Sequence, residues 1–199
     1  IYDHIAGGFY RYSTDPNWNI PHFEKMLYDN AQLISIYSKA YTSFKDPVYK
    51  QIALETIAFL QKEMKGNNGG YYAAIDADSE GEEGKYYVWT NKELTELISN
   101  EFDLFSAYYS TASSKRMEGD KIVLRKSEDD KGFAKLHQIT LNELHELKAD
   151  WNSNLLRARE ERVRPRIDDK IIVSWNSLLI NGYVDAYKAF GDTNYLKEA

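Results

Sequence analysis

The most constraining feature of this 199-residue sequence is an internal repeat. When the chain is shifted by 146 residues, residues 30–53 align without a gap to residues 176–199, and 10 of the 24 pairs are identical. The matches preserve an apolar stripe at spacings of three and four, and a capping Asp before the next helix. The repeat therefore predicts tandem helical hairpins. The identical pairs are Asn30/Asn176, Leu33/Leu179, Ile34/Ile180, Tyr37/Tyr183, Ala40/Ala186, Tyr41/Tyr187, Phe44/Phe190, Asp46/Asp192, Tyr49/Tyr195 and Ala53/Ala199.

A second, shorter repeat supports the same interpretation. Residues 7–10 read Gly-Gly-Phe-Tyr and residues 69–72 read Gly-Gly-Tyr-Tyr, each where a new unit should begin. Two unrelated helical hairpins would share apolar stripes, but they would not also share the Asn and the capping Asp. A tandem array is therefore favoured over two unrelated hairpins.

Local signals place the elements of this array. The apolar stripe predicts a helix over residues 23–44, and Asp46-Pro47 then caps and opens a second helix that Gly66 ends. β-forming residues at 71–72 and 86–89 flank the polar stretch 78–84, which predicts a β-hairpin.

Capping boxes mark two helices in the second half of the chain. Thr90 with Glu93 opens a short helix, and Thr140 with Glu143 opens one that reaches about Arg162. A short strand is expected at residues 122–124, and a last long helix at residues 175–190.

Composition excludes several classes of function. The formal charge of −6 argues against a nucleic-acid partner, and the absence of a run of 18 apolar residues argues against a membrane partner. Five arginines between residues 157 and 166 are mixed with Glu160 and Glu161, which predicts a solvated helix face. The absence of cysteine removes disulfides and thiolate chemistry. Nucleotide-binding and zinc-protease motifs are absent, so no cofactor is expected.

The two ends of the sequence indicate a piece of a longer protein. The chain begins at Ile1 without a Met and ends at Ala199 within a helical pattern. We take the cytoplasm as its expected location.

Three stretches together carry a family resemblance. The first is Gly-Gly-Phe-Tyr-Arg-Tyr-Ser at residues 7–13 with Pro-His-Phe-Glu-Lys-Met-Leu-Tyr-Asp-Asn-Ala-Gln-Leu at 21–33. The second is Asp-Ala-Asp-Ser-Glu-Gly-Glu-Glu-Gly-Lys-Tyr-Tyr-Val-Trp at 76–89, and the third is Asp-Asp-Lys at 168–170 with Ser-Trp-Asn at 174–176. Over essentially its whole length the chain resembles the YyaL-like, spermatogenesis-associated protein 20 family.

The resemblance implies a mainly α fold, a partial (α/α)6 toroid of helical hairpins with a small β-hairpin insertion. Such toroids are akin to six-hairpin glycosidases and N-acylglucosamine 2-epimerases. Residues 1–199 would be a fragment of one toroid domain, and the full protein would carry a thioredoxin-like domain upstream as a partner. Tyr10 stands where the family commonly has His, and Ala6 where it often has Gly.

In such a toroid, the first group of candidate site residues surrounds the start of the first long helix. His22, Glu24 and Asp29 are candidate acid–base residues, because burial can tune the pKa values of imidazole and carboxyl groups. The alternative is structural: Glu24 favours the helix N-terminus, and His22 caps or packs there. The residues expected to bind substrate here are Tyr10, Arg11, Trp18, Tyr28 and Asn30.

The second group is an acidic loop. Asp76, Asp78 and Glu80 match the first half of a calcium-binding loop, but Tyr87 stands where the bidentate Glu should be, so calcium is only a weak candidate. The rival interpretations are a solvated hairpin tip and a loop folded over the site. In the latter, Asp76 and Asp78 are candidates for the carboxylate chemistry of glycosidases.

The third group precedes and opens the repeated helix. Asp169 is a candidate catalytic carboxylate, and Trp175 and Asn176 are candidates for substrate binding. We therefore expect a carbohydrate-active or carbohydrate-binding domain that uses acid–base chemistry on a sugar-like small molecule. The alternative is a non-catalytic helical scaffold for protein–protein interaction.

Overall fold

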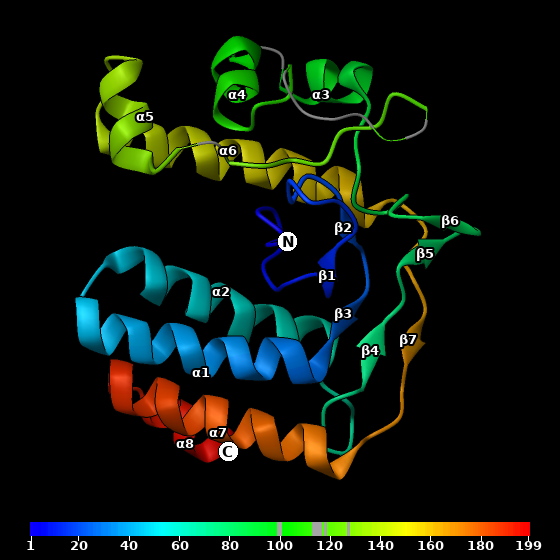
Figure 1. Cartoon of the computed structure of the whole chain (residues 1–199), viewed down its shortest axis with the longest axis vertical. Coiled ribbons are helices and arrows are strands. Elements are labelled where there is room, and N and C mark those ends of the chain that lie inside the picture. Colours follow the sequence, from blue (N-terminus) through cyan, green and yellow to red (C-terminus); the bar gives the residue numbers. More distant parts are fainter. Residues whose placement is uncertain (99–100, 113–116, 118, 127) are drawn as a thin grey trace. The chain divides into compact units, whose positions relative to one another are not determined.

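The computed structural model describes residues 1–98, 101–112, 117, 119–126 and 128–199. It is mainly helical with a few short strand pairs (Figure 1), which confirms the predicted mainly α class. The chain divides into two compact units. Unit 1 contains Ile1–Tyr12, His22–Glu83 and Pro165–Ala199, and unit 2 contains Ser13–Pro21 and Gly84–Arg164. The strands β1 (Tyr12–Ser13) and β2 (Pro21–His22) lie where the chain passes between the units. The single toroid domain stays a prediction.

Unit 1 is built from two helical hairpins and a small sheet. The hairpins are α1 (Leu27–Phe44) with α2 (Pro47–Glu63), and α7 (Val173–Phe190) with α8 (Thr193–Glu198). The sheet has the order β3 (Lys25–Met26), β4 (Ala74–Ile75) and β7 (Ile167–Asp168), and both of its pairings are antiparallel. The first helix thus begins at Leu27 and not at residue 23, because Lys25 and Met26 pair with β4 instead of entering the helix.

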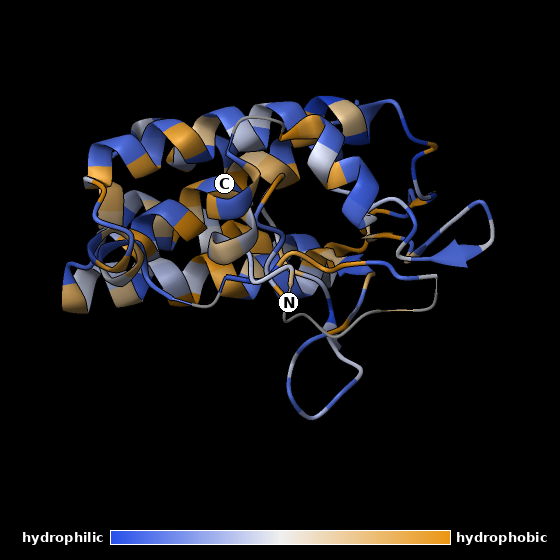
Figure 2. Cartoon of the chain, turned by 90° about the horizontal axis from the view of Figure 1, so that it is seen from above, coloured by the Kyte–Doolittle hydropathy of each residue, from blue (hydrophilic) through white to orange (hydrophobic). Residues whose placement is uncertain are grey.

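Helices α1 and α7 run side by side in the same direction (Figure 1). Tyr28 contacts Trp175 near their N-termini, and Tyr41 contacts Phe190 near their C-termini. Gly182 allows the close approach, because a Cβ at this position would lie 2.8 Å from the carbonyl oxygen of Ala31. Both helices therefore present their N-terminal ends to the same end of unit 1. The helices are amphipathic, with hydrophilic and hydrophobic residues interspersed along each ribbon (Figure 2).

The core of unit 1 lies between these hairpins and takes residues from both repeats. Leu179, Tyr183 and Ala186 of α7 are buried with Leu27, Ala31 and Ile34 of α1 and with residues of α2. Leu179, Tyr183 and Ala186 are all identical between the two repeats, but their counterparts Leu33, Tyr37 and Ala40 in α1 are only partly buried, so this part of the matched stripe faces the core in α7 alone.

The short repeat (residues 7–10 and 69–72) and the long repeat (residues 30–53 and 176–199) contact each other in the same way at two places. The Phe9 N–H donates to Asn30 Oδ1 (2.7 Å), and Asn30 Nδ2 donates to the carbonyls of Phe9 (3.1 Å) and Met26 (2.9 Å). In the second repeat the Tyr71 N–H donates to Asn176 Oδ1 (2.8 Å), and Asn176 Nδ2 donates to the carbonyls of Tyr71 (3.0 Å) and Ile172 (3.1 Å). We call each set of bonds an asparagine clamp. The clamps confirm the predicted repeat.

The helix ends also repeat. Lys45 caps the C-terminus of α1 and Gly191 that of α7, both with left-handed backbone (φ 56° and 78°). Asp46 then accepts from the Val48 N–H, and Asp192 accepts from the Asn194 N–H, as the capping prediction required.

The predicted β-hairpin exists, but its strands are shorter and lie elsewhere. β5 (Asp78–Ser79) pairs with β6 (Glu82–Glu83) inside the stretch that the sequence indicated as the polar tip. Glu80 and Gly81 form its turn with φ of 54° and 77°, the backbone of a type I′ turn. The prediction of strands at 71–72 and 86–89 is wrong. Tyr71 forms only an isolated bridge with Lys65, and the N–H groups of Tyr87 and Val88 donate to the Gly84 carbonyl in a turn.

Unit 2 is a second helical cluster. It contains α3 (Asn91–Leu97), α4 (Phe102–Tyr108), α5 (Asp130–Leu136) and α6 (Leu141–Glu160), and both predicted capping boxes are present. Trp151 of α6 packs against Phe105 and Tyr108 of α4. The expected strand at 122–124 is reduced to a single bridge between Ile122 and Trp89.

The prediction of a solvated arginine face is wrong for two of the five arginines. Arg159 is 2% exposed, and its guanidinium lies 5.4 Å from the ring centroid of Tyr87. Arg162 donates to the carbonyls of Lys85, Tyr86 and Val88 and forms an ion pair with Glu93. The local charge pattern of the sequence cannot reveal this role, because the partners lie about 70 residues away.

None of the helices in the described part of the chain combines the length and the hydrophobicity needed to cross a bilayer.

We predict that the two asparagine clamps differ in their contribution to stability. Asn30→Ala leaves the buried Phe9 N–H and carbonyl without partners, and we expect it to lower the free energy of unfolding by about 2–4 kcal/mol. Asn176→Ala should cost less, about 1–2 kcal/mol, because Asn176 is partly exposed and water can replace its bonds. Urea denaturation of both variants measures the difference. An Asn30→Ala variant as stable as the parent protein would contradict this role.

Candidate functional site

A cluster of polar and aromatic side chains lies at the N-terminal ends of α1 and α7, and we call it the α1/α7 cluster. Its members come from three separate parts of unit 1. They are Arg11, Tyr12, His22, Glu24, Tyr28, Asp29, Glu83 and Trp175.

His22 stands between two carboxylates. Its Nδ1 lies 2.6 Å from Glu83 Oε1, and its Nε2 lies 3.2 Å from Glu24 Oε2. Its ring stacks on Tyr12 at a centroid distance of 4.9 Å. When the Nδ1 proton is donated to Glu83, the lone pair of Nε2 faces Glu24 Oε2, so a proton accepted at Nε2 is shared with the Glu24 carboxylate. The side chain is 23% exposed, so a ligand can reach it.

Arg11 joins the histidine to the aromatic part of the cluster. Its guanidinium donates to Glu24 Oε2 (2.8 Å) and to the Tyr28 hydroxyl (3.1 Å). Tyr28 in turn meets the edge of Trp175 at a centroid distance of 4.8 Å. The backbone helps to set this geometry, because the Arg11 N–H donates to the Glu24 carbonyl (2.9 Å). Charged donors and flat aromatic surfaces therefore stand side by side.

Asp29 differs from the other members of the cluster because one of its carboxyl oxygens has no hydrogen-bond partner. Its Oδ2 is buried, and it has no hydrogen-bond partner. Burial raises the pKa of the Asp29 carboxyl; the Arg11 guanidinium opposes this shift, and the Glu24 carboxylate adds to it. A carboxyl that retains its proton more readily than usual is suited to act as a general acid.

The structure places the remaining predicted site residues differently. Tyr10 is buried and packs on Phe23, and Asn30 and Asn176 are occupied by the asparagine clamps. We therefore leave these three residues out of the candidate site. Trp18 belongs to unit 2, where it is 61% exposed.

The acidic candidates lie on the surface of unit 1. Asp76, Asp78 and Asp169 are exposed, and only Asp78 is tied to the cluster, through its register with Glu83 in the β5–β6 hairpin. Among the described residues no group of three or more His, Asp or Glu side chains is placed to hold a metal ion. The weak calcium candidate formed by Asp76, Asp78 and Glu80 stays a prediction. His22 also lacks this arrangement, because its two carboxylates face opposite ring nitrogens.

Glu83 is the functional candidate that sequence reasoning missed. It was recognisable as part of the acidic loop, but its 61-residue separation from His22 gives no local signal. Only the fold of the β5–β6 hairpin brings the two together.

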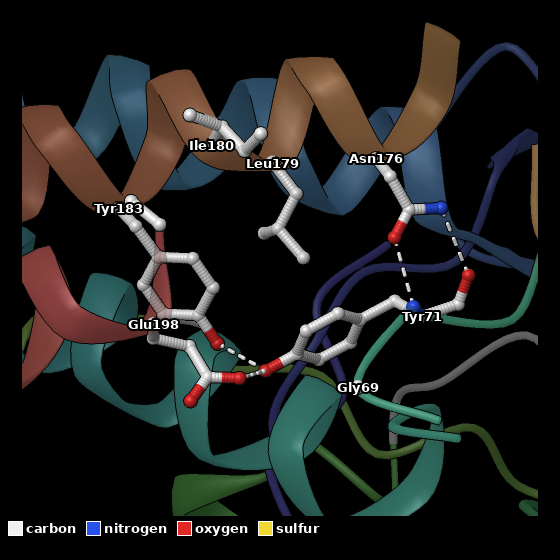
Figure 3. Close-up of a pocket in the computed structure, with 8 residues that line it drawn as sticks. Gly69, Tyr71, Asn176, Leu179, Ile180, Tyr183 and Glu198 are labelled. Carbon is white, nitrogen blue, oxygen red and sulfur yellow. Dashed lines mark hydrogen bonds between the residues drawn. The ribbon is translucent and has the colours of Figure 1, made fainter. Parts of the chain in front are cut away.

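A pocket of about 150 Å³ lies beside Gly69, Leu179 and Ile180 (Figure 3). The Tyr71 hydroxyl donates to Glu198 (2.7 Å) and bonds to the Tyr183 hydroxyl (2.7 Å), and Glu198 also accepts from Lys65. Burial raises the pKa of Tyr183 to about 12, so its hydroxyl keeps its proton at neutral pH. Because these polar groups are bonded to one another, we place no function in this pocket.

The described architecture is that of a tandem helical-hairpin protein with a polar cluster at the N-terminal ends of its repeated helices. The comparisons confirm the resemblance to the spermatogenesis-associated protein 20 family. The chain is 32% identical to human and 29% identical to mouse spermatogenesis-associated protein 20, each over 225 residues, and 36% identical over 224 residues to uncharacterized protein B0495.5 of Caenorhabditis elegans. All of the chain is matched, but it spans only 28–31% of the length of these relatives.

No protein-family model matches the chain. Similar solved structures include a D-mannose isomerase (14% identity, TM-score 0.35, 96% of this chain and 43% of that one). They also include a family 76 glycoside hydrolase from a bovine Bacteroides thetaiotaomicron strain (15% identity, TM-score 0.37, 99% of this chain and 37% of that one). A third is the cellobiose 2-epimerase of Spirochaeta thermophila (16% identity, TM-score 0.36, 99% of this chain and 46% of that one). At these low sequence identities and TM-scores, the similarities assign neither an activity nor a substrate to this chain.

We predict that Asp29 lowers the stability of the folded protein at neutral pH. Because its pKa is raised in the folded state, ionisation disfavours folding, and this penalty is absent below the pKa of the unfolded carboxyl, about 3.9. Asp29→Asn should therefore raise Tm near neutral pH, and the gain should shrink as the pH falls toward about 4. Thermal denaturation over a pH series measures this.

The exposed Asp150 provides a matched control for that experiment. Asp150→Asn should leave Tm close to that of the parent protein at each pH. The assignment of a buried, unpartnered carboxyl fails if Asp29→Asn lowers Tm at neutral pH.

Proposed function

We propose that unit 1 carries a carbohydrate-binding site with acid–base chemistry in the α1/α7 cluster. Asp29 is the proposed general acid, and His22, oriented by Glu83, is the proposed base. Arg11 and Tyr28 would bond to sugar hydroxyls, and Trp175 would offer an aromatic face or edge to the ring.

The observation that carries this proposal is the contrast between Asp29 and its neighbours. Glu24 and Glu83 are bonded to Arg11 and His22, whereas Asp29 Oδ2 is buried without a donor. Asp29 and His22 are linked through Glu24 and Arg11, and a carboxyl of raised pKa together with a histidine whose ring is oriented provides one group that can give a proton and one that can take it. The family resemblance drawn from the sequence motifs favours the same class of reaction.

The substrate would exchange protons with the protein in a definite way. Asp29 would donate its proton to the oxygen that leaves or is polarised, and His22 Nε2 would take a proton from water or from a carbon-bound position of the sugar. Both a glycosidase and an epimerase need such a pair, so the cluster supports the chemistry without choosing between these two reactions.

We expect the protein to bind a mono- or disaccharide in isothermal titration calorimetry. Asp29→Asn and His22→Gln should weaken binding about tenfold or more, which corresponds to about 1.4 kcal/mol. Where proton NMR detects conversion of a bound sugar, each variant should lower kcat by about 10²–10⁴, as for other acid–base groups.

The matched control for these variants is Asp46→Ser with Asp192→Ser. Ser retains the helix cap but removes the charge, at the ends of α1 and α7 farthest from the cluster. Wild-type binding by the control and loss of binding by the cluster variants would support the site. The proposal is wrong if no sugar of a broad panel binds, or if the folded Asp29→Asn and His22→Gln variants bind sugar as the parent protein does. Either result would favour the alternative, a non-catalytic helical scaffold for protein–protein interaction.

A further inference from the structure

Glu24 contacts two basic side chains of the α1/α7 cluster through a single oxygen. Its Oε2 lies 2.8 Å from Arg11 Nη1 and 3.2 Å from His22 Nε2. The backbone sets the first contact, because the Arg11 N–H donates to the Glu24 carbonyl (2.9 Å) and keeps the two residues side by side. Arg11 Nε donates in addition to the Tyr28 hydroxyl (3.1 Å). The guanidinium is therefore oriented by two side chains at once.

Asp29 is the carboxyl that this arrangement leaves without a cation. Its Oδ2 is buried and has no hydrogen-bond partner, although Tyr28, its neighbour in the sequence, is bonded to Arg11. Two charged groups act on Asp29 besides its burial. The Arg11 guanidinium lowers the pKa of its carboxyl, and the Glu24 carboxylate raises it. Arg11 is thus close enough to act on Asp29, but its described side-chain bonds go to Glu24 and Tyr28.

The contact between Arg11 and Glu24 matters more for Asp29 than for stability. An ion pair as exposed as this one contributes little to folding by itself. A guanidinium that paired with the partly buried Asp29 would, however, hold that carboxyl in its ionised form. Glu24 competes with Asp29 for the same cation, and the backbone bond beside it favours Glu24.

We infer that Glu24 is a positioning residue, which holds the Arg11 guanidinium away from Asp29 and so lets the Asp29 carboxyl keep its proton. The inference rests on the proposed function for its purpose, since a general acid must be protonated before it can act. The arrangement of charges is independent of any sugar and can be tested without one.

Thermal denaturation of paired variants at pH 7 tests this role of Glu24. In the parent protein Asp29→Asn should raise Tm, because the pKa of Asp29 is raised in the folded state. In a Glu24→Gln background Arg11 is released to Asp29, so the pKa of Asp29 falls below that of the unfolded carboxyl and ionisation favours folding. Asp29→Asn should there lower Tm by about 2–4 °C, as expected for a partly exposed ion pair. This loss should vanish as the pH falls below about 4.

Two further backgrounds identify the group responsible. Glu83→Gln removes the other carboxylate that contacts His22 but leaves Glu24 on Arg11, so Asp29→Asn should still raise Tm. Arg11→Gln removes the cation, so adding Glu24→Gln to it should not reverse the effect of Asp29→Asn. Far-UV circular dichroism establishes that each variant is folded, and Glu24→Ser, which removes the same charge, replaces Glu24→Gln if the latter does not fold.

The outcomes distinguish this inference from the proposed function. If Asp29→Asn still raises Tm in the folded Glu24→Gln background, Glu24 does not withhold Arg11 and the inference is wrong; a sugar that binds then leaves the proposed function standing. If the effect reverses but no sugar binds, the positioning of Arg11 by Glu24 is supported and the proposed function is wrong. A reversal that persists in Arg11→Gln also overturns the inference, since another group would then ionise Asp29.

Discussion

The asparagine clamp is the interaction on which the rest of unit 1 depends. In each repeat a glycine-containing segment must approach a helix with its backbone, and a backbone N–H and carbonyl would otherwise be buried without partners. One carboxamide satisfies both, since it offers a donor and an acceptor in the spacing of a peptide group. Its second amide hydrogen binds the carbonyl four residues earlier, at a helix start that has no side-chain cap.

The clamp also fixes the place of the functional groups. Phe9 is held against α1 by Asn30, and Arg11 follows two residues later, where its own N–H binds the Glu24 carbonyl. A second constraint acts on the same segment. Lys25 Nζ donates to Asp3 and to the Gly7 carbonyl, both at 2.8 Å, and lies over the ring of Phe59. Loss of one partner of a buried ion pair typically costs about 3–5 kcal/mol, so this segment is tied down twice.

Much of this fold was predictable because its signals are local or repeated. The caps at Asp46, Thr90 and Thr140 are read from neighbouring residues, and the repeat is visible at a fixed shift. The sequence even contained both halves of the asparagine clamp, although nothing in it indicated that Asn30 bonds to Phe9. What sequence reasoning missed depends on distant partners: the pairing of Lys25 with Ile75, which delays the first helix, and the burial of Arg159. The same limit applies to the site, where His22 and Glu24 are neighbours in sequence but Glu83 is not.

The α1/α7 cluster differs from two other polar groups of unit 1 in its hydrogen bonding, although the Ser38 hydroxyl of α1 is also buried without a partner. Around Tyr71, and around Lys25 and Asp3, the polar atoms are bonded to one another within the fold, so the arrangement is complete without a ligand. At the cluster, Asp29 Oδ2 stays unpaired while burial raises the pKa of its carboxyl, and this arrangement costs stability. In the same unit a single side chain, Asn30, pairs both the N–H and the carbonyl of Phe9, so the fold does pair buried polar groups near Asp29 in sequence. The unpaired carboxyl is therefore better explained by a ligand that bonds to it than by packing alone.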